Sequence, residues 1–197
     1  VSEEYLTLGS ARTLAGYVLY SNRALYPMWA HLEDAVREGG HRWSQTFGNE
    51  GPLFSAFFAT PQATRTFLQG MHGFGVLSSP AVVSAFDLSG FRRLVDLGGG
   101  TGHLAHAARE RYPGLSAAVF ELPGVVEIAR ELAPAGLEFI GGDFFEDELP
   151  EADLYALGQI LHDWAEDKIA LLLRRIAARL PAGGGLLIAE RLLTPDG

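Results

Sequence analysis

Acidic residues follow three short apolar segments in the second half of the sequence, and a histidine follows a fourth. Asp96 stands just before the run Gly98 to Gly102, Glu121 ends the second segment, Asp143 follows the third, and His162 comes after the fourth. Carboxylates accept hydrogen bonds from hydroxyl and amine groups and attract cations, and an imidazole can take up a proton near neutral pH. These residue types predict a ligand site, provided that the fold brings them together.

The elements that position these residues alternate between strand-like and helical patterns. Strands are expected over 94–97, 117–121, 137–140, 153–158 and 186–190, and helices over 103–111, 125–132 and 169–180. Such alternation predicts an α/β fold with a Rossmann-like, doubly wound and mostly parallel sheet. Ligands bind at the carboxyl ends of the strands in such sheets, so the three acids and His162 are expected at one edge.

The preceding residues, 1–90, have helical spacing. Five apolar residues recur at i, i+3, i+4, i+7 and i+11 and predict one buried helix face: Leu25, Met28, Trp29, Leu32 and Val36. Gly39-Gly40 should end this helix. A second helix is expected behind Thr60-Pro61, with Phe67, Met71 and Phe74 on one side, and a third from Pro80 to Phe86.

The glycine run distinguishes between classes of ligand. A dinucleotide-binding loop has glycine at its first, third and sixth positions, but the sixth position counted from Gly98 is His103. The Gly-Lys-Ser/Thr sequence of a phosphate-binding loop is also absent from the sequence. A dehydrogenase or other nucleotide enzyme is therefore disfavoured. S-adenosylmethionine, with a cationic sulfonium, an ammonium and a ribose hydroxyl pair for Glu121, fits better. Asp96 would either contact the ligand or hold the loop through hydrogen bonds.

Four segments resemble a known family. Val95 to Gly102 is similar to the first motif of S-adenosylmethionine-dependent methyltransferases. Phe120 to Pro123, Gly142 to Phe145 and Leu161 to Trp164 narrow the resemblance to the small-molecule O-methyltransferases, which include acetylserotonin, caffeic acid and bacterial polyketide O-methyltransferases. The resemblance runs from about Trp29 to the end of the chain.

The resemblance implies a role for each matched residue. The cofactor-binding set would be Gly98, Gly100, Glu121, Gly142, Asp143 and Phe144. The two loop glycines would approach the methionine portion, Glu121 would bind the ribose hydroxyls, and Asp143 would accept from the adenine amine while Phe144 stacks on the ring. His162 would be the general base that takes a proton from the hydroxyl of a small aromatic acceptor.

Some positions depart from the family pattern. Gln159 stands where family members often have a basic or aromatic residue, and Phe58 and Gly75 fall where acetylserotonin enzymes have Tyr and Trp. These departures keep open a non-catalytic member that binds the cofactor, or only dimerises. Two local alternatives also stay open. Asp163 would orient His162 or cap the next helix, and Trp164 would clamp an acceptor ring or pack under the loop.

Composition excludes several other classes of function. The 15 Lys and Arg against 24 Asp and Glu give a net charge of −9, which disfavours nucleic acid as a partner. Zero cysteines exclude thiolate metal sites and cysteine nucleophiles. His103 and His106 share a helix face without a third ligand, so no metal is expected. No apolar run reaches the roughly 18–20 residues that span a bilayer, and a cytoplasmic location is expected.

The resemblance also implies a domain organisation. Residues 1–90 would be a helical linker and substrate lid behind a winged-helix dimerisation domain that this chain lacks, and the full-length protein would be a homodimer. Residues 91–197 would be the S-adenosylmethionine-binding domain, ending after the fifth strand. Family members continue there with an antiparallel hairpin and often a Glu that partners the catalytic His, so that Glu is expected beyond Gly197.

Overall fold

The computed structural model describes residues 1–48 and 54–192, and the chain divides into two compact units, Val1–Leu77 and Ser78–Gly197. Each unit is described by itself. In the described residues no helix is both long and apolar enough to cross a membrane.

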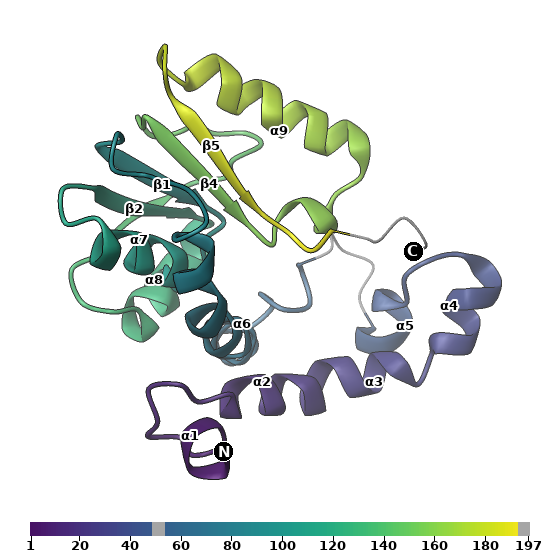
Figure 1. The fold of residues 1–197 in the computed structure, drawn as a ribbon. Coiled ribbons are helices and arrows are strands. Elements are labelled where there is room, and N and C mark those ends of the chain that lie inside the picture. The colour runs from purple at the N-terminus through teal and green to yellow at the C-terminus, as the bar shows by residue number, and fades with distance from the viewer. Residues whose placement is uncertain (49–53, 193–197) are drawn as a thin grey trace. The chain divides into compact units, whose positions relative to one another are not determined.

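The first unit is helical (Figure 1). Its helices are α1 (Ser2–Tyr5), α2 (Ala15–Tyr20), the π-helical turn η1 (Ser21–Leu25), α3 (Tyr26–Trp29), α4 (Leu32–Glu38), α5 (Trp43–Phe47) and most of α6 (Pro61–Val82). Aromatic rings form its core, with the Phe57 and Phe67 ring centroids 5.0 Å apart and the Tyr20 and Phe67 centroids 5.7 Å apart. Met71 also packs against this cluster.

The expected single helix from Leu25 to Val36 is wrong. The chain leaves the helical conformation at His31, so α3 and α4 are separate helices. Trp29 and Val36 are 65% and 74% exposed. The break at His31 separates Leu32 and Val36 from Leu25, Met28 and Trp29, so the five residues do not form one helix face. The predicted end of the helix is confirmed, because Gly39 adopts the left-handed conformation at the C-cap.

The expected third helix from Pro80 to Phe86 is also wrong. Pro80 lies inside α6, which continues to Val82. Proline lacks an N–H group and its ring crowds the carbonyl four residues back, so it usually disrupts a helix interior. Only Ala81 and Val82 follow Pro80 in α6, so the disruption falls at the end of the helix. The chain then turns, and Tyr112 Oη donates to the Phe86 carbonyl at 3.0 Å.

The second unit contains a five-stranded parallel sheet. Its strands, in spatial order, are β3 (Glu138–Gly141), β2 (Ser116–Glu121), β1 (Arg93–Leu97), β4 (Leu154–Gly158) and β5 (Gly185–Ala189). All five predicted strands are therefore confirmed. The strand order reverses between β1 and β4, which is where doubly wound sheets bind ligands.

Helices cover both faces of this sheet (Figure 1). The helices α7 (His103–Arg111) and α8 (Pro123–Leu132) lie on one face, and α9 (Glu166–Arg179) lies on the other. A short 3₁₀ turn, η2 (Leu161–Asp163), joins β4 to α9. All three helices agree with the sequence prediction to within a few residues at their ends.

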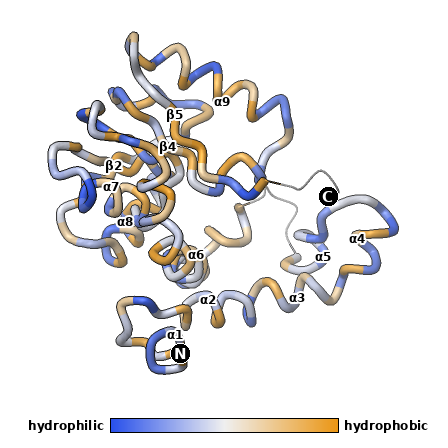
Figure 2. The backbone as a smooth tube through the Cα atoms, in the orientation of Figure 1, coloured by the Kyte–Doolittle hydropathy of each residue, from blue (hydrophilic) through white to orange (hydrophobic). Residues whose placement is uncertain are grey.

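The alternation of side chains along the strands divides the core into two layers. Val95, Leu97 and Tyr155 pack with Leu172 and Ile176 of α9, and all five are almost completely buried. Figure 2 shows the hydrophobic colour along β4 and β5 and the mixed colouring of α9. Burial of one such side chain stabilises the fold by about 1.5–3 kcal/mol. Because neighbouring residues of a strand face opposite ways, Asp96 points to the α7 face.

Candidate functional site

The glycine loop follows β1 in a conformation that favours glycine. Gly98, Gly100 and Gly102 have φ values of 68°, 55° and 75°. A Cβ atom on Gly98 would lie 2.7 Å from Ile160 Cδ1 and 3.3 Å from Phe144 Cε1. The loop, Phe144 and the turn after β4 are therefore neighbours. Two predicted binding residues, Gly98 and Phe144, come together at the carboxyl edge of the sheet.

Glu121 lies beside the same loop. Its Oε2 accepts a hydrogen bond from the Gly100 backbone N–H at 3.1 Å, and its Oε1 accepts one from the Leu122 N–H at 2.8 Å. Burial raises the pKa of this carboxyl, while the two N–H donors lower it. A carboxylate has about four acceptor positions, so two positions stay open for ligand hydroxyls. The structure thus brings Gly100 and Glu121 together, as predicted.

Asp96 is buried under the glycine loop without a hydrogen-bond partner. Its side chain is 1% exposed, and neither carboxyl oxygen has a partner. Burial, and then the charge of Glu121, raise its pKa to about 7. The Ala105 N–H lowers this pKa but falls short of hydrogen-bond geometry.

Between the two roles expected for Asp96, holding the loop through hydrogen bonds is therefore wrong. The carboxyl only fills the space next to Gly99, where a Cβ would lie 2.5 Å from Oδ2. A buried carboxylate without donors is stabilised by a nearby cation. The buried acid, the hydroxyl-accepting Glu121 and the glycine cradle thus fit a cofactor such as S-adenosylmethionine, which has cationic groups and ribose hydroxyls.

The residues after β3 form a compact turn. Asp143 Oδ1 accepts from the Phe145 N–H at 2.8 Å, and the Asp143 N–H donates to Asp147 Oδ2 at 2.8 Å. A Cβ on Gly142 would collide with the Phe120 ring, so packing alone requires glycine there. The predicted roles of Gly142, Asp143 and Phe144 toward the adenine stay predictions.

Trp164 packs against two neighbouring phenylalanines. Its ring centroid lies 4.7 Å from that of Phe145 and 6.3 Å from that of Phe144, both nearly perpendicular. Trp164 also packs against the buried cluster between the sheet and α9. These contacts favour the packing role over the acceptor clamp.

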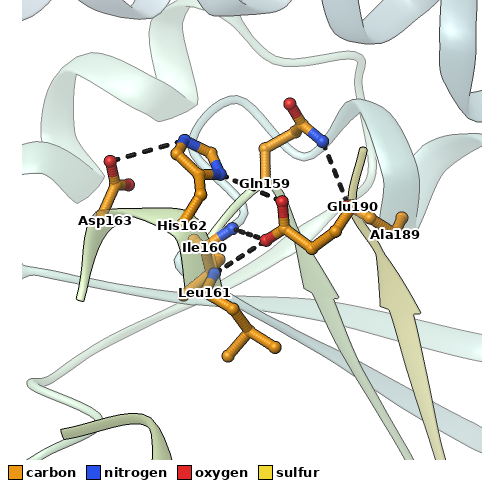
Figure 3. Close-up of polar contacts among 7 residues, drawn as sticks. All are labelled: Gln159, Ile160, Leu161, His162, Asp163, Ala189 and Glu190. Carbon is orange, nitrogen blue, oxygen red and sulfur yellow. Dashed lines mark hydrogen bonds and ion pairs between the residues drawn. The ribbon is translucent and has the colours of Figure 1, made fainter. Parts of the chain in front are cut away.

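His162 lies between two carboxylates on the turn η2 (Figure 3). Its Nδ1 is 3.0 Å from Glu190 Oε2, and its Nε2 is 3.4 Å from Asp163 Oδ1. The other oxygen of Glu190, Oε1, accepts from the backbone N–H groups of Ile160 and Leu161 at 2.8 and 2.7 Å. Glu190 therefore holds both the histidine ring and the turn that carries it.

The Glu expected beyond Gly197 concerns residues outside this sequence and stays a prediction, but a Glu partner of His162 is also present within the chain. Glu190 directly follows β5 and makes this contact within the chain. The parallel pairing of β4 with β5 places Gly158 opposite Ala189, and this register brings the two following turns together. The available signal was the acid at the end of the fifth strand, which repeats the pattern of Asp96, Glu121 and Asp143.

Asp163 contacts His162 and does not cap α9. The N-cap of α9 is Ala165, without a side-chain hydrogen bond. Burial raises the pKa of Asp163, His162 lowers it, and Glu190 raises it. The orienting role expected for Asp163 is thus the one that the structure supports.

His103 and Phe58, two other residues discussed from the sequence, each make contacts within their own unit. His103 Nδ1 is 2.9 Å from Ser79 Oγ. Over residues 1–48 and 54–192, no group of three or more His, Asp and Glu side chains could hold a metal ion. Phe58 stacks on Phe54 in the first unit, with ring centroids 5.5 Å apart.

Comparison with known proteins places this geometry in a family. A family model described as an O-methyltransferase domain matches residues 29–197. Acetylserotonin O-methyltransferases from Bos taurus and Homo sapiens are 43% and 40% identical over 100% of this chain. The chain spans 59% and 58% of their lengths.

Solved structures agree with this family assignment. Human N-acetylserotonin methyltransferase in complex with SAM superposes with a TM-score of 0.95 at 41% identity, over 99% of this chain and 57% of that one. The structure described as PigF with SAH has a TM-score of 0.87 at 29% identity, over 98% and 60%. The matched residues, together with a fold that agrees with them, show that the chain belongs to the O-methyltransferase family, and the two solved structures above hold S-adenosylmethionine and its demethylated product.

Proposed function

We propose that the protein transfers a methyl group from S-adenosylmethionine to a hydroxyl of a small aromatic acceptor, with His162 as general base. The observation that supports this most strongly is the imidazole held between Glu190 and Asp163, on the turn that contacts the glycine loop through Ile160. The acetylserotonin relatives support an aromatic acceptor class.

The cofactor half of the site would bind and orient. When bound, S-adenosylmethionine supplies an electrophilic methyl group on a cationic sulfur. The loop from Gly98 to Gly102 allows close approach of the backbone, Glu121 has acceptor positions left for hydroxyls, and Asp96 offers a buried carboxylate to positive charge. Correct alignment of two reactants can lower a barrier by about 7–11 kcal/mol.

The histidine half would move the proton. Glu190 Oε2 accepts the Nδ1–H of His162, which leaves the Nε2 lone pair to receive the proton of the acceptor hydroxyl. A free phenol has a pKa of ~10, so only about one molecule in a thousand is ionised at neutral pH. Asp163, next to Nε2, then stabilises the imidazolium that forms. A positioned base of this kind supplies roughly 10²–10⁴-fold in rate.

Other parts of the proposal concern the whole protein. A homodimeric assembly and a cytoplasmic location stay predictions from the family resemblance. A member of the family that binds the cofactor without turnover is the alternative function. The departures at Phe58, Gly75 and Gln159 keep it open, while the intact His162 argues against it.

Replacement of His162 separates these two functions. In His162→Ala, methyl transfer to a panel of phenols should fall by about 10²-fold or more, while calorimetric affinity for S-adenosylmethionine should change by less than about 3-fold. His106→Gln, on α7, is the matched control. Full turnover in His162→Ala would exclude the base. Tight cofactor binding by the parent without methylation of any phenol would favour the non-catalytic alternative.

A further inference from the structure

Gln159 has a backbone conformation that side chains rarely adopt. Of residues 1–48 and 54–192 it is the one non-glycine residue with a positive φ, at 59°. For a residue other than Gly, Asn or Asp this conformation is strained, and such residues cluster at functional sites. Gln159 directly follows β4 and precedes the turn that carries His162.

Two hydrogen bonds join Gln159 to one carbonyl group on the next strand. Its backbone N–H donates to the Ala189 carbonyl oxygen at 2.9 Å, and its side-chain Nε2 donates to the same oxygen at 3.2 Å (Figure 3). The backbone bond ends the β4–β5 ladder. The side-chain bond is an additional tether, on the residue that precedes Glu190.

These bonds close a ring of contacts around the end of the two strands. Gln159 holds Ala189, and the carboxylate of the next residue, Glu190, holds the N–H groups of Ile160 and Leu161 and the imidazole of His162. The left-handed turn at Gln159 ends the extended path of β4, so the N–H groups that follow point to Glu190. Each half of the ring thus fixes the other.

We propose that Gln159 is a positioning residue for the His162–Glu190 pair, acting through the Ala189 carbonyl; this role rests on the function proposed above. A glycine would adopt the same φ without strain, but it has no side-chain amide to donate the second hydrogen bond. The hydrogen bond from the Gln159 side chain to the Ala189 carbonyl gives a reason for a glutamine at this strained position. Its effect on catalysis is then indirect, through the orientation of the imidazole.

The test uses the side-chain nitrogen signals of His162 in the ¹⁵N-histidine-labelled chain, assigned with His162→Gln. Gln159→Met keeps the side-chain length but removes the donor. In the parent, His162 should show one tautomer with a slowly exchanging Nδ1–H. In Gln159→Met this proton should exchange with solvent at least about 3-fold faster, and the ¹⁵N chemical shifts of the ring should move toward the average of the two tautomers. Gln159→Lys, which restores a donor, should return toward the parent pattern, and Gln62→Met on α6 should match the parent.

Turnover gives the second readout. Gln159→Met should lower kcat by about 3–10-fold with KM for S-adenosylmethionine changed by less than about 2-fold. Unchanged His162 signals in Gln159→Met, or a loss of thermal stability without a change in them, would overturn the positioning role. Should Gln159→Met not fold, Gln159→Gly, which also relieves the strain, replaces it with the same criterion. Absence of methyl transfer by the parent would contradict the proposed function, while the nitrogen signals would still decide the role of Gln159.

Discussion

Two pairs of carboxylates lie at the same edge of the sheet and differ in what surrounds them. Asp96 and Glu121, at the ends of β1 and β2, are buried beside the glycine loop, and burial raises the pKa of both. Glu190 and Asp163 lie at the ends of β5 and η2, on either side of the His162 imidazole. One pair lies beside the glycine loop, and the other lies beside an imidazole.

We propose that this difference separates cofactor binding from proton transfer. The first pair contains Asp96, whose charge has no hydrogen-bond donor and would be stabilised by a cationic ligand. The second pair fixes the tautomer of an imidazole and can stabilise its protonated form without any ligand. If this distinction is correct, substitutions in the two pairs should affect different measurements.

Loss of Glu190 should have the largest effect. Glu190→Ala removes the acceptor for His162 Nδ1 and for two backbone N–H groups, so kcat should fall by about 10²–10³-fold and stability by roughly 1–3 kcal/mol. Glu190→Gln, which keeps an acceptor oxygen for the turn, should recover most of the stability but not the rate. Glu127→Gln on α8 is the control. Parent-like turnover in Glu190→Ala would remove the distinction between the pairs.

The pH dependence of stability should reveal Asp96. Its pKa is about 7 in the folded protein and about 4 in the unfolded chain. Between these values the folded state keeps a proton that the unfolded state has released, so stability falls as pH rises from about 4 to about 7.

Asp96→Asn should reduce this loss of stability between about pH 4 and pH 7 by up to a few kcal/mol. Part of the slope should persist, because burial also raises the pKa of Glu121. Urea unfolding at intervals from about pH 4 to pH 8 gives the curves. Identical slopes for the parent and Asp96→Asn would show that Asp96 is ionised throughout.

Ligand charge should matter at the first pair. Asp96→Asn should weaken binding of S-adenosylmethionine by about 10-fold, and that of its demethylated product, which lacks the sulfonium charge, by less. Calorimetry at low and high salt measures both affinities. Equal losses for the two ligands would mean that Asp96 does not respond to the sulfonium charge.

Asp163 should have the smallest effect. Its Oδ1 lies 3.4 Å from His162 Nε2, longer than a normal hydrogen bond. Asp163→Asn should therefore lower kcat by only about 2–5-fold, with Asp167→Asn on α9 as the control. A loss as large as that of Glu190→Ala would show that the two carboxylates act equally on the imidazole.

The strands and their acids could be predicted from sequence because the information is local. Apolar runs such as 94–97, bounded by glycines, predict strands, and parallel pairing then brings their ends to one edge. Glu121 next to Gly100 follows from that topology alone. The helix α9 was predictable because its apolar residues, from Ile169 to Leu180, keep a steady period over about three turns.

The features that were missed depend on contacts between distant residues or on local changes of helical phase. The Glu190–His162 contact joins residues 28 positions apart and needs the register of β4 with β5. The positive φ of Gln159 has no sequence signal, because glutamine is not a residue that favours it. The break at His31 was hidden by an apolar period that continued across it.

A double-substitution cycle on the catalytic pair tests the central claim most directly, which is that Glu190 acts on methyl transfer through His162. Single-turnover rates would be measured for the parent, Glu190→Gln, His162→Gln and the double variant. We predict that Glu190→Gln slows the parent by about 10-fold or more but slows His162→Gln by less than about 2-fold. Equal slowing in both backgrounds would show that Glu190 and His162 act independently, and would contradict the account.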